Sequence, residues 1–316
     1  MFTEFIEKNI LIKDIDEKQI QLSKKLVETN LDLIKVNLLN LRTSIDNEVN
    51  RLKENKLPQN QLICNLIQKY FSEKNRPIST HYPIGDCFPI THIAYNYIRF
   101  KLITTLEWNF LLEFLNSGGI FKPVWGQRAG IVYQTAIQLG SYYIDIANDT
   151  VDLNEPKVEI NLMKNSKFKN INDLTEYSNI NKIYCNNSLI PNFLYPNISS
   201  SFPFFIISKE NQVYFHQSPY ITGLIHNSKG MKLVDYFNNS FLDISNEHYG
   251  TIEHFFDSLR KNSSLQPLLE RIEYAPNNPY WNVAELFSDN ERNKENFLLC
   301  KSIMKFYNFR NSNLKY

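Results

Sequence analysis

The chain has 316 residues, 43% hydrophobic and 21% charged, and its 34 basic side chains almost balance its 33 acidic ones. This composition is typical of a folded chain, and the length supports one large hydrophobic core or two smaller ones. A net charge of +1 gives no general attraction to nucleic acid or to an anionic membrane, so neither is an expected partner.

The N-terminal part is predicted to be helical. Apolar residues recur at spacings of three and four between residues 14 and 55, and Thr29-Asn30 marks a break in that pattern. Pro58 ends the stretch, and a further short helix is expected over residues 62–71. Residues 1–73 are therefore predicted to form a helical N-terminal region, which packs on the rest of the fold or offers a surface to a partner protein.

The main domain is predicted to span residues 74–316 and to begin with a loop rich in Pro and Gly. One apolar helix should follow, from residue 89 or 90 to about residue 115. Residues 131–139 and 142–146 are rich in β-forming side chains, and Gly140-Ser141 between them supplies a two-residue turn. This pattern predicts a β-hairpin.

In the rest of the chain, segments with a clear secondary-structure pattern alternate with segments that have none. Residues 152–200 are polar with few strong elements, and a second hairpin is expected over residues 204–215 with its turn near Glu210-Asn211. Helices are predicted over residues 251–260, from a capping box at Ser263, and over residues 291–306. The predicted fold class is α+β, with a helical N-terminal layer, a central helix packed on an antiparallel sheet, and a helical C-terminal part.

The sequence also predicts a cytoplasmic location. No run of 18 apolar residues is present, and the N-terminal residues lack the uninterrupted apolar core of a signal peptide. The four cysteines lie far apart, with no CxxC pair, which is not the pattern of a disulfide scaffold; they are Cys64, Cys87, Cys185 and Cys300. This cysteine pattern is explained most simply by a reducing compartment.

Cys87 is the candidate nucleophile. It follows Gly85-Asp86 and stands directly before the predicted apolar helix. Unpaired N–H groups at a helix start lower the pKa of a thiol and can stabilise an oxyanion. These features point to a cysteine-dependent hydrolase or acyl transferase that acts on an amide, peptide or thioester. The alternative is a buried, inert cysteine, the common state of a free thiol.

A Gly-x-Cys at a helix start, followed about 45 to 60 residues later by a hairpin that ends in Asp, resembles the transglutaminase-like branch of the papain-like cysteine enzymes. The resemblance implies a Cys-His-Asp triad on a helix packed against a sheet, with Cys87 as nucleophile and Asp145, or else Asp149, as the orienting acid. The family's histidine would lie near residues 128–134, but this chain has none between His92 and His216.

A base would therefore come from elsewhere, and the candidates are His81 and His216. Gln134 or Gln127 would be the polar partner of the oxyanion. Loop aromatics such as Trp125 can line a groove for a small-molecule or peptide substrate. The remaining candidates for substrate contact are Asp86, Arg128 and Asp149. The acids at the end of the hairpin are also ordinary turn residues.

Two other functions stay open. One is a non-catalytic binding or interaction protein on a degenerate cysteine-enzyme scaffold, which the missing histidine favours. The other is a metal-dependent enzyme using some of His81, His92, His216 and His226, although their spacing fits no common metal module. No cofactor is expected, because the chain has no P-loop and no GxGxxG. GxSxG, the mark of an α/β-hydrolase, is likewise missing.

Overall fold

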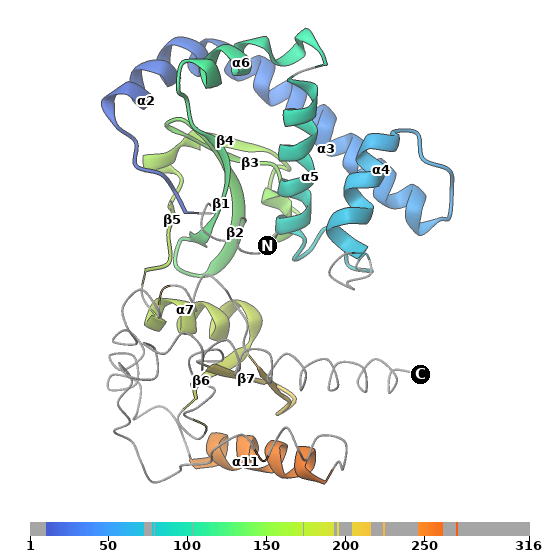
Figure 1. Ribbon diagram of the computed structural model, residues 1–316, viewed down its shortest axis with the longest axis vertical. Coiled ribbons are helices and arrows are strands. Elements are labelled where there is room, and N and C mark those ends of the chain that lie inside the picture. Colours follow the sequence, from blue (N-terminus) through green and yellow to red (C-terminus); the bar gives the residue numbers. More distant parts are fainter. Residues whose placement is uncertain are drawn as a thin grey trace. The chain divides into compact units, whose positions relative to one another are not determined.

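The computed structural model describes residues 11–72, 78, 80–102, 104–172, 174–192, 195, 204–215, 224, 246–261 and 270 (Figure 1). The chain divides into two compact units, residues 1–170 and 171–316. The boundary predicted between residues 73 and 74 lies inside the first unit, where the N-terminal helices share one hydrophobic core with the sheet.

The first unit begins with helices, as predicted. Helix α2 (Glu17–Leu22) is capped by Asp16 and continues as a π-helical turn and a 3-10 turn that ends at Asn30, where the sequence indicated a break. Helix α3 (Leu31–Lys53) buries an apolar stripe at helical spacing, formed by Ile34, Leu38, Leu41, Ile45 and Val49. Helix α4 (Gln61–Ile67) starts at the cap Asn60 and ends in a π-helical turn, Gln68–Ser72.

The single helix predicted from residue 89 to about residue 115 is wrong, because two helices occupy this stretch. Helix α5 (Cys87–Lys101) is separated from α6 (Asn109–Asn116) by a 3-10 turn, Leu106–Trp108. The hydroxyls of Thr104 and Thr105 donate to the carbonyls of Phe100 and Lys101, and such bonds compete with helix continuation. The break lets Trp108 turn into the core, where it is buried.

A five-stranded antiparallel sheet follows in the order β4-β3-β2-β1-β5. Its strands are β1 (Phe121–Arg128), β2 (Val132–Leu139), β3 (Tyr142–Asp145), β4 (Glu159–Leu162) and β5 (Phe168–Lys169). The predicted hairpin is confirmed as β2–β3. Its turn needs glycine, because Gly140 has a φ of +57° and a Cβ atom there would lie 2.1 Å from the Ser23 Oγ.

The two faces of the sheet pack against different partners. Ile137, Leu139 and Ile144 point to the face covered by α5 and join the main core, and Figure 1 shows α5 running alongside the strands, with α3 and α4 beyond it. The opposite face carries a smaller cluster made of Val124, Ala136, Tyr143, Met163 and Phe168. Because side chains alternate along a strand, each residue of β2 and β3 is assigned to one face by its position.

A buried ion pair joins the helices to the sheet. Arg42 of α3 is fully buried, and its Nη1 lies 2.5 Å from Asp149 Oδ1 and 3.1 Å from the carbonyl oxygen of Ile146. Its Nε donates to Asp46 at 2.9 Å, and Asp46 also accepts a bond from the hydroxyl of Tyr82 at 2.6 Å. These contacts fix the segment after β3, and the turn before α5, against α3.

The second unit contains helix α7 (Leu174–Ile180), strands β6 (Asn187–Pro191), β7 (Phe204–Ser208) and β8 (Val213–Phe215), and helix α11 (Asn246–Arg260). The predicted hairpin over residues 204–215 is confirmed as β7–β8, with Asn211 at a φ of 56° in its turn. The helix predicted over residues 251–260 lies within α11, and the two predicted after it lie outside the described residues. The α+β fold class is therefore confirmed.

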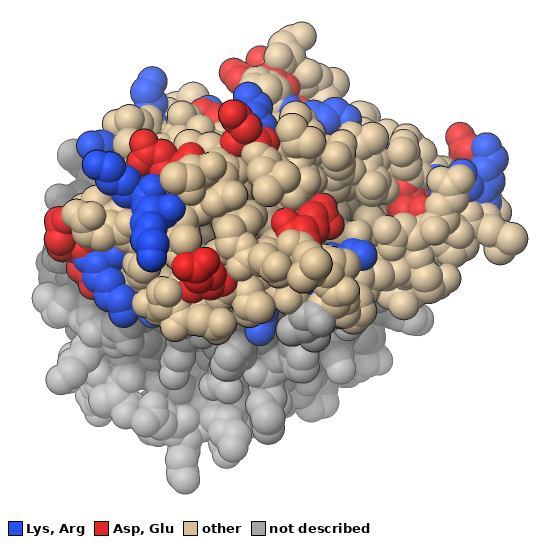
Figure 2. Space-filling view, turned by 90° about the horizontal axis from the view of Figure 1, so that it is seen from above, with Lys and Arg blue, Asp and Glu red and all other residues tan. Residues whose placement is uncertain are grey.

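The surface agrees with the balanced charge of the sequence. Figure 2 shows acidic and basic side chains close together on the face seen from above, among a majority of other residues. Among the residues that the structure describes, no helix combines the length and the apolar character needed to cross a membrane.

The buried ion pair gives a first prediction. Arg42→Met should lower the free energy of unfolding by about 3–5 kcal/mol, because it leaves the carboxylate of Asp149 buried without its partner. The measurement is urea denaturation followed by circular dichroism. Arg51→Met is the matched control, since the guanidinium of Arg51 bonds the Leu57 carbonyl at the surface. The double variant Arg42→Met/Asp149→Asn should be less destabilised than Arg42→Met alone. An equal decrease in the free energy of unfolding for Arg42→Met and Arg51→Met would contradict the stabilising role of the Arg42–Asp149 pair.

Candidate functional site

Cys87 is the first residue of α5, and the turn before it is fixed by the backbone. Gly85 has a φ of +75°, a conformation that glycine adopts without strain, and its N–H donates to the Thr150 carbonyl at 2.9 Å. The N–H of Asp86 donates to the Pro83 carbonyl at 3.0 Å, and the Asp86 side chain is buried. The start of the helix is thus held against the segment that follows β3.

The thiol of Cys87 is in a protonated state at neutral pH. Although the residue is partly exposed, burial of the thiol raises its pKa to about 11, and the negative charge of Asp145 adds to the increase. Hydrogen bonds with Thr135 lower the pKa by less, and Sγ donates to Thr135 Oγ1 at 3.9 Å. The direction is opposite to the one that the helix start alone predicts, because desolvation of a thiolate outweighs the helix dipole here.

His81 and His92, the two histidines nearest to Cys87 in the sequence, make other contacts. His81 lies in the turn before α5, with its Nδ1 3.2 Å from the hydroxyl oxygen of Thr80. His92 is buried within α5, and its ring lies against Phe88, with ring centroids 4.2 Å apart, and against Tyr70. The hydrogen-bond partner of the Cys87 sulfur is Thr135 rather than either imidazole. His216 and His226 lie outside the described residues.

Asp145, the expected orienting acid, is held by three donors. Gln134 Nε2 donates to its Oδ2 at 2.5 Å, the Tyr143 hydroxyl to the same oxygen at 2.8 Å, and the Ala147 N–H to Oδ1 at 2.8 Å. Burial raises the pKa of Asp145 to about 6, although these three hydrogen bonds and Arg128 act in the opposite direction. The carboxylate therefore joins β2, β3 and the turn after β3.

The sheet separates Asp145 from Cys87. Gln134 and Thr135 are consecutive residues of β2 and therefore point to opposite faces. Thr135 contacts Cys87 on the α5 side, whereas Gln134 bonds Asp145 on the side of Tyr143. The structure brings Gln134 and Asp145 together and places both on the face away from Cys87.

Trp125 is one of two predicted substrate contacts on the sheet face of Thr135, which meets Cys87. It pairs with Thr135 across the β1–β2 ladder, and its ring stacks on Tyr133 with centroids 5.5 Å apart. Gln127 is buried on the same face, but its Oε1 accepts a hydrogen bond from the Gly130 N–H at 2.5 Å and fixes the β1–β2 turn. The aromatic pair and Gln127 thus lie on the sheet face that carries Thr135.

Two more of the predicted contacts, Arg128 and Asp149, stabilise the fold. Arg128 bonds the side chain of Asn148 and lies 2.9 Å from Glu159 Oε2, across β1 and β4. Asp149 is the partner of the buried Arg42. Both residues hold the segment after β3 in place.

Sequence reasoning did not identify Arg42, Thr135 or Tyr143. Arg42 had a usable signal, because it stands inside the apolar stripe of α3 between Leu41 and Ile45, where a charge needs a buried partner. Thr135 and Tyr143 gave no such signal, since their roles depend on the register of the sheet.

A metal site is not formed by the described part of the chain. Within it, no group of three or more His, Cys, Asp or Glu side chains is arranged to hold an ion. Comparisons with protein-family models, with curated proteins and with solved structures found no match. The chemistry of the site is therefore inferred from its own residues.

The raised pKa of Asp145 predicts a pH dependence of stability. Its pKa is raised from 3.8 to about 6, so the folded state binds the proton more tightly than the unfolded chain. This stabilisation is fully present below about pH 4 and is lost as the pH rises through about 6. The shift corresponds to at most about 3 kcal/mol.

Asp145→Asn should remove the pH-dependent stability that Asp145 provides. The free energy of unfolding of the wild-type protein should therefore fall more than that of the variant between pH 4 and pH 7, as measured by denaturation at both values. Asp152→Asn is the control, because Asp152 is exposed and bonds only its own loop among the described residues. An identical pH profile for Asp145→Asn and wild type would refute the assignment.

Proposed function

We propose that this chain is a non-catalytic binding protein, on a helix–sheet arrangement of the kind that the resemblance to transglutaminase-like cysteine enzymes implies. One observation carries the proposal: the sulfur of Cys87 donates its hydrogen bond to Thr135, while Asp145 is held by Gln134 and Tyr143 on the other face of the sheet. Burial of the thiol, which raises its pKa to about 11, acts in the same direction. A cysteine nucleophile needs the reverse, a thiolate with a base beside it.

The direction of the pKa shift argues against catalysis by Cys87. Burial raises the pKa of the thiol, so a smaller fraction of it is ionised at pH 7 than of an ordinary cysteine. Thr135 offers a hydroxyl, which does not act as a base at neutral pH. The described surroundings of Cys87 thus support the proposal of an unreactive thiol.

The partners that a triad would need have other contacts. Asp145 is held by Gln134, Tyr143 and the Ala147 N–H on the far face of the sheet, where it cannot orient an imidazole beside the thiol. His92 packs among aromatic rings. These contacts support a structural role for both residues.

A cysteine hydrolase or acyl transferase is the second candidate. It is favoured by the position of Cys87 at the start of the 15-residue helix α5, where the helix dipole stabilises a thiolate. Trp125 and Tyr133 on the same face would contact the amide, peptide or thioester substrate, and His81 or His216 would be the base. This candidate predicts an activated thiol, which makes the two functions distinguishable.

The test is alkylation of the folded, full-length protein with iodoacetamide, with each cysteine quantified by mass spectrometry. Cys87 should react at least about tenfold more slowly than Cys185 at pH 7, because the thiolate is the reactive species. Cys185 is the internal reference because the residue is exposed, although burial of its thiol also raises its pKa. The Cys87 rate should still be rising at pH 9, below its pKa of about 11.

Labelling in urea controls for intrinsic reactivity, and there the two cysteines should react at similar rates. If Cys87 reacts faster than Cys185 at pH 6 in the folded protein, the non-catalytic proposal fails and the cysteine enzyme takes its place.

A further inference from the structure

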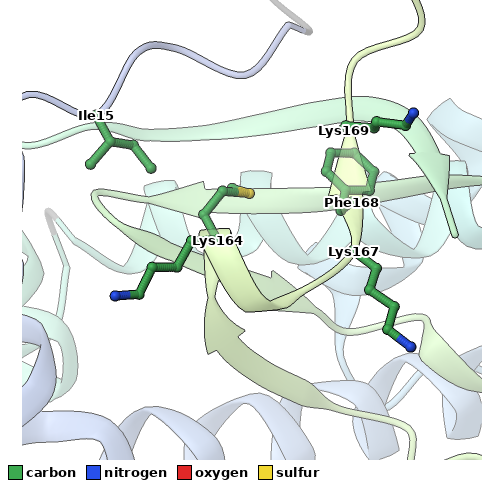
Figure 3. Close-up of a pocket in the computed structure, with 6 residues that line it drawn as sticks. Ile15, Lys164, Lys167, Phe168 and Lys169 are labelled. Carbon is green, nitrogen blue, oxygen red and sulfur yellow. The ribbon is translucent and has the colours of Figure 1, made fainter.

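The first unit has a hollow on the sheet face opposite to α5. It is a shallow hollow, widely open to solvent, with a volume of about 560 Å³. Its walls come from the segment before α2, from the 3-10 turn after β4 and from β5, and the lining residues are Ile15, Met163, Lys164, Lys167, Phe168 and Lys169. Figure 3 shows Ile15 on one side of this hollow and Phe168 on the other.

The floor of the hollow is apolar and firmly packed. Met163 and Phe168 are buried and belong to the cluster on this face of the sheet, and the Phe168 ring lies 5.2 Å from that of Tyr143. Ile15 is partly buried against the same cluster. A ligand would therefore meet an apolar surface that is already packed before it binds, which lowers the entropy cost of binding.

The rim of the hollow is basic. Its three lysines are exposed, and none of the six lining residues is acidic. Figure 3 shows the chains of Lys164, Lys167 and Lys169 extending outward from the hollow in different directions. Long lysine side chains can swing over an apolar surface while the ammonium group stays in water. The hollow thus combines an apolar floor with positive charge at its edge.

Two further lysines raise the positive potential of this face. Lys122 Nζ donates to the Leu11 carbonyl at 2.7 Å, and burial, followed by the charge of Lys13, lowers the pKa of Lys122 to about 8. The acidic residues nearest in sequence to Lys13 and Ile15 are Asp14 and Asp16. Asp14 is exposed, and Asp16 accepts a hydrogen bond from the Gln19 N–H as the cap of α2. The basic side chains outnumber these acids.

We propose that this hollow binds a small amphipathic anion, with its apolar body against Ile15, Met163 and Phe168 and its carboxylate or phosphate group held by the lysines of the rim. An exposed lysine alone attracts an anion weakly, but burial of an apolar body next to it adds the hydrophobic contribution. The inference rests on the proposed binding function, to which it gives a ligand class. Its test is separate, because the hollow does not involve Cys87.

The experiment is isothermal titration calorimetry of the full chain with decanoate below its micellar concentration. Decanoate should bind at least about tenfold more tightly than decanol, which lacks the charge, and than acetate, which lacks the apolar body. Decyl phosphate should also bind, and its ratio to decanoate indicates which anionic group the rim prefers. Higher salt should weaken both anions.

Variants locate the site. Lys164→Glu/Lys167→Glu should weaken decanoate binding by about tenfold or more, and Ile15→Asn should weaken decanoate and decanol alike. Lys24→Glu/Lys25→Glu makes the same change of charge at two exposed lysines outside the hollow and should leave the affinity within about twofold. Circular dichroism checks that each variant is folded.

The proposal is overturned if decanoate does not bind, if decanol binds as tightly, or if the two double variants have the same affinity. Such results would leave the proposed function standing, since slow labelling of Cys87 tests that function. Fast labelling of Cys87 together with decanoate binding at the hollow would overturn the non-catalytic proposal alone.

Discussion

The first unit depends on one buried charge. Burying a guanidinium costs several kcal/mol unless its donors are satisfied, so Arg42 constrains every element that supplies it with an acceptor. Those acceptors come from α3 itself through Asp46 and from the segment after β3 through Asp149 and the Ile146 carbonyl. Tyr82 then bonds Asp46, and Gly85 bonds the Thr150 carbonyl, so the same contacts fix the start of α5. The ion pair and these neighbouring hydrogen bonds therefore fix the position of Cys87 together.

The sheet then decides which chemistry this position permits. A one-residue step along a strand reverses the direction of a side chain, and Gln134 and Thr135 take opposite faces for this reason. Thr135 meets the thiol, and Gln134 meets Asp145. The spacing of a cysteine and a later hairpin acid can thus resemble a catalytic triad while the backbone keeps the two groups apart. Desolvation raises the pKa of the Cys87 thiol, which favours its protonated form, and it also raises the pKa of Asp145 toward neutral pH.

The sequence predicted what depends on local periodicity, namely the N-terminal helices, both hairpins and the start of a helix close to Cys87. It missed the break between α5 and α6, which comes from Thr104 and Thr105, and it missed β1, whose Pro and Gly weaken the strand pattern. The residue types of the candidate site were visible, but their grouping was not, because it depends on strand register and on the partner of Arg42. The roles suggested for His216 and His226 stay predictions, since both lie outside the described residues.

The proposed binding site lies on the face opposite to α5. The N-terminal segment lies across it: the Lys13 N–H donates to the Gln138 side chain, which returns a hydrogen bond to the Lys13 carbonyl, both at 2.9 Å. This pairing positions Ile15 at the edge of the hollow without using a strand. Beneath it, Tyr143 supports Phe168 on one side and bonds Asp145 on the other. The hydrogen bond from Tyr143 to Asp145 thus also supports the apolar floor of the hollow, and a floor that is formed before a ligand binds lowers the entropy cost of binding.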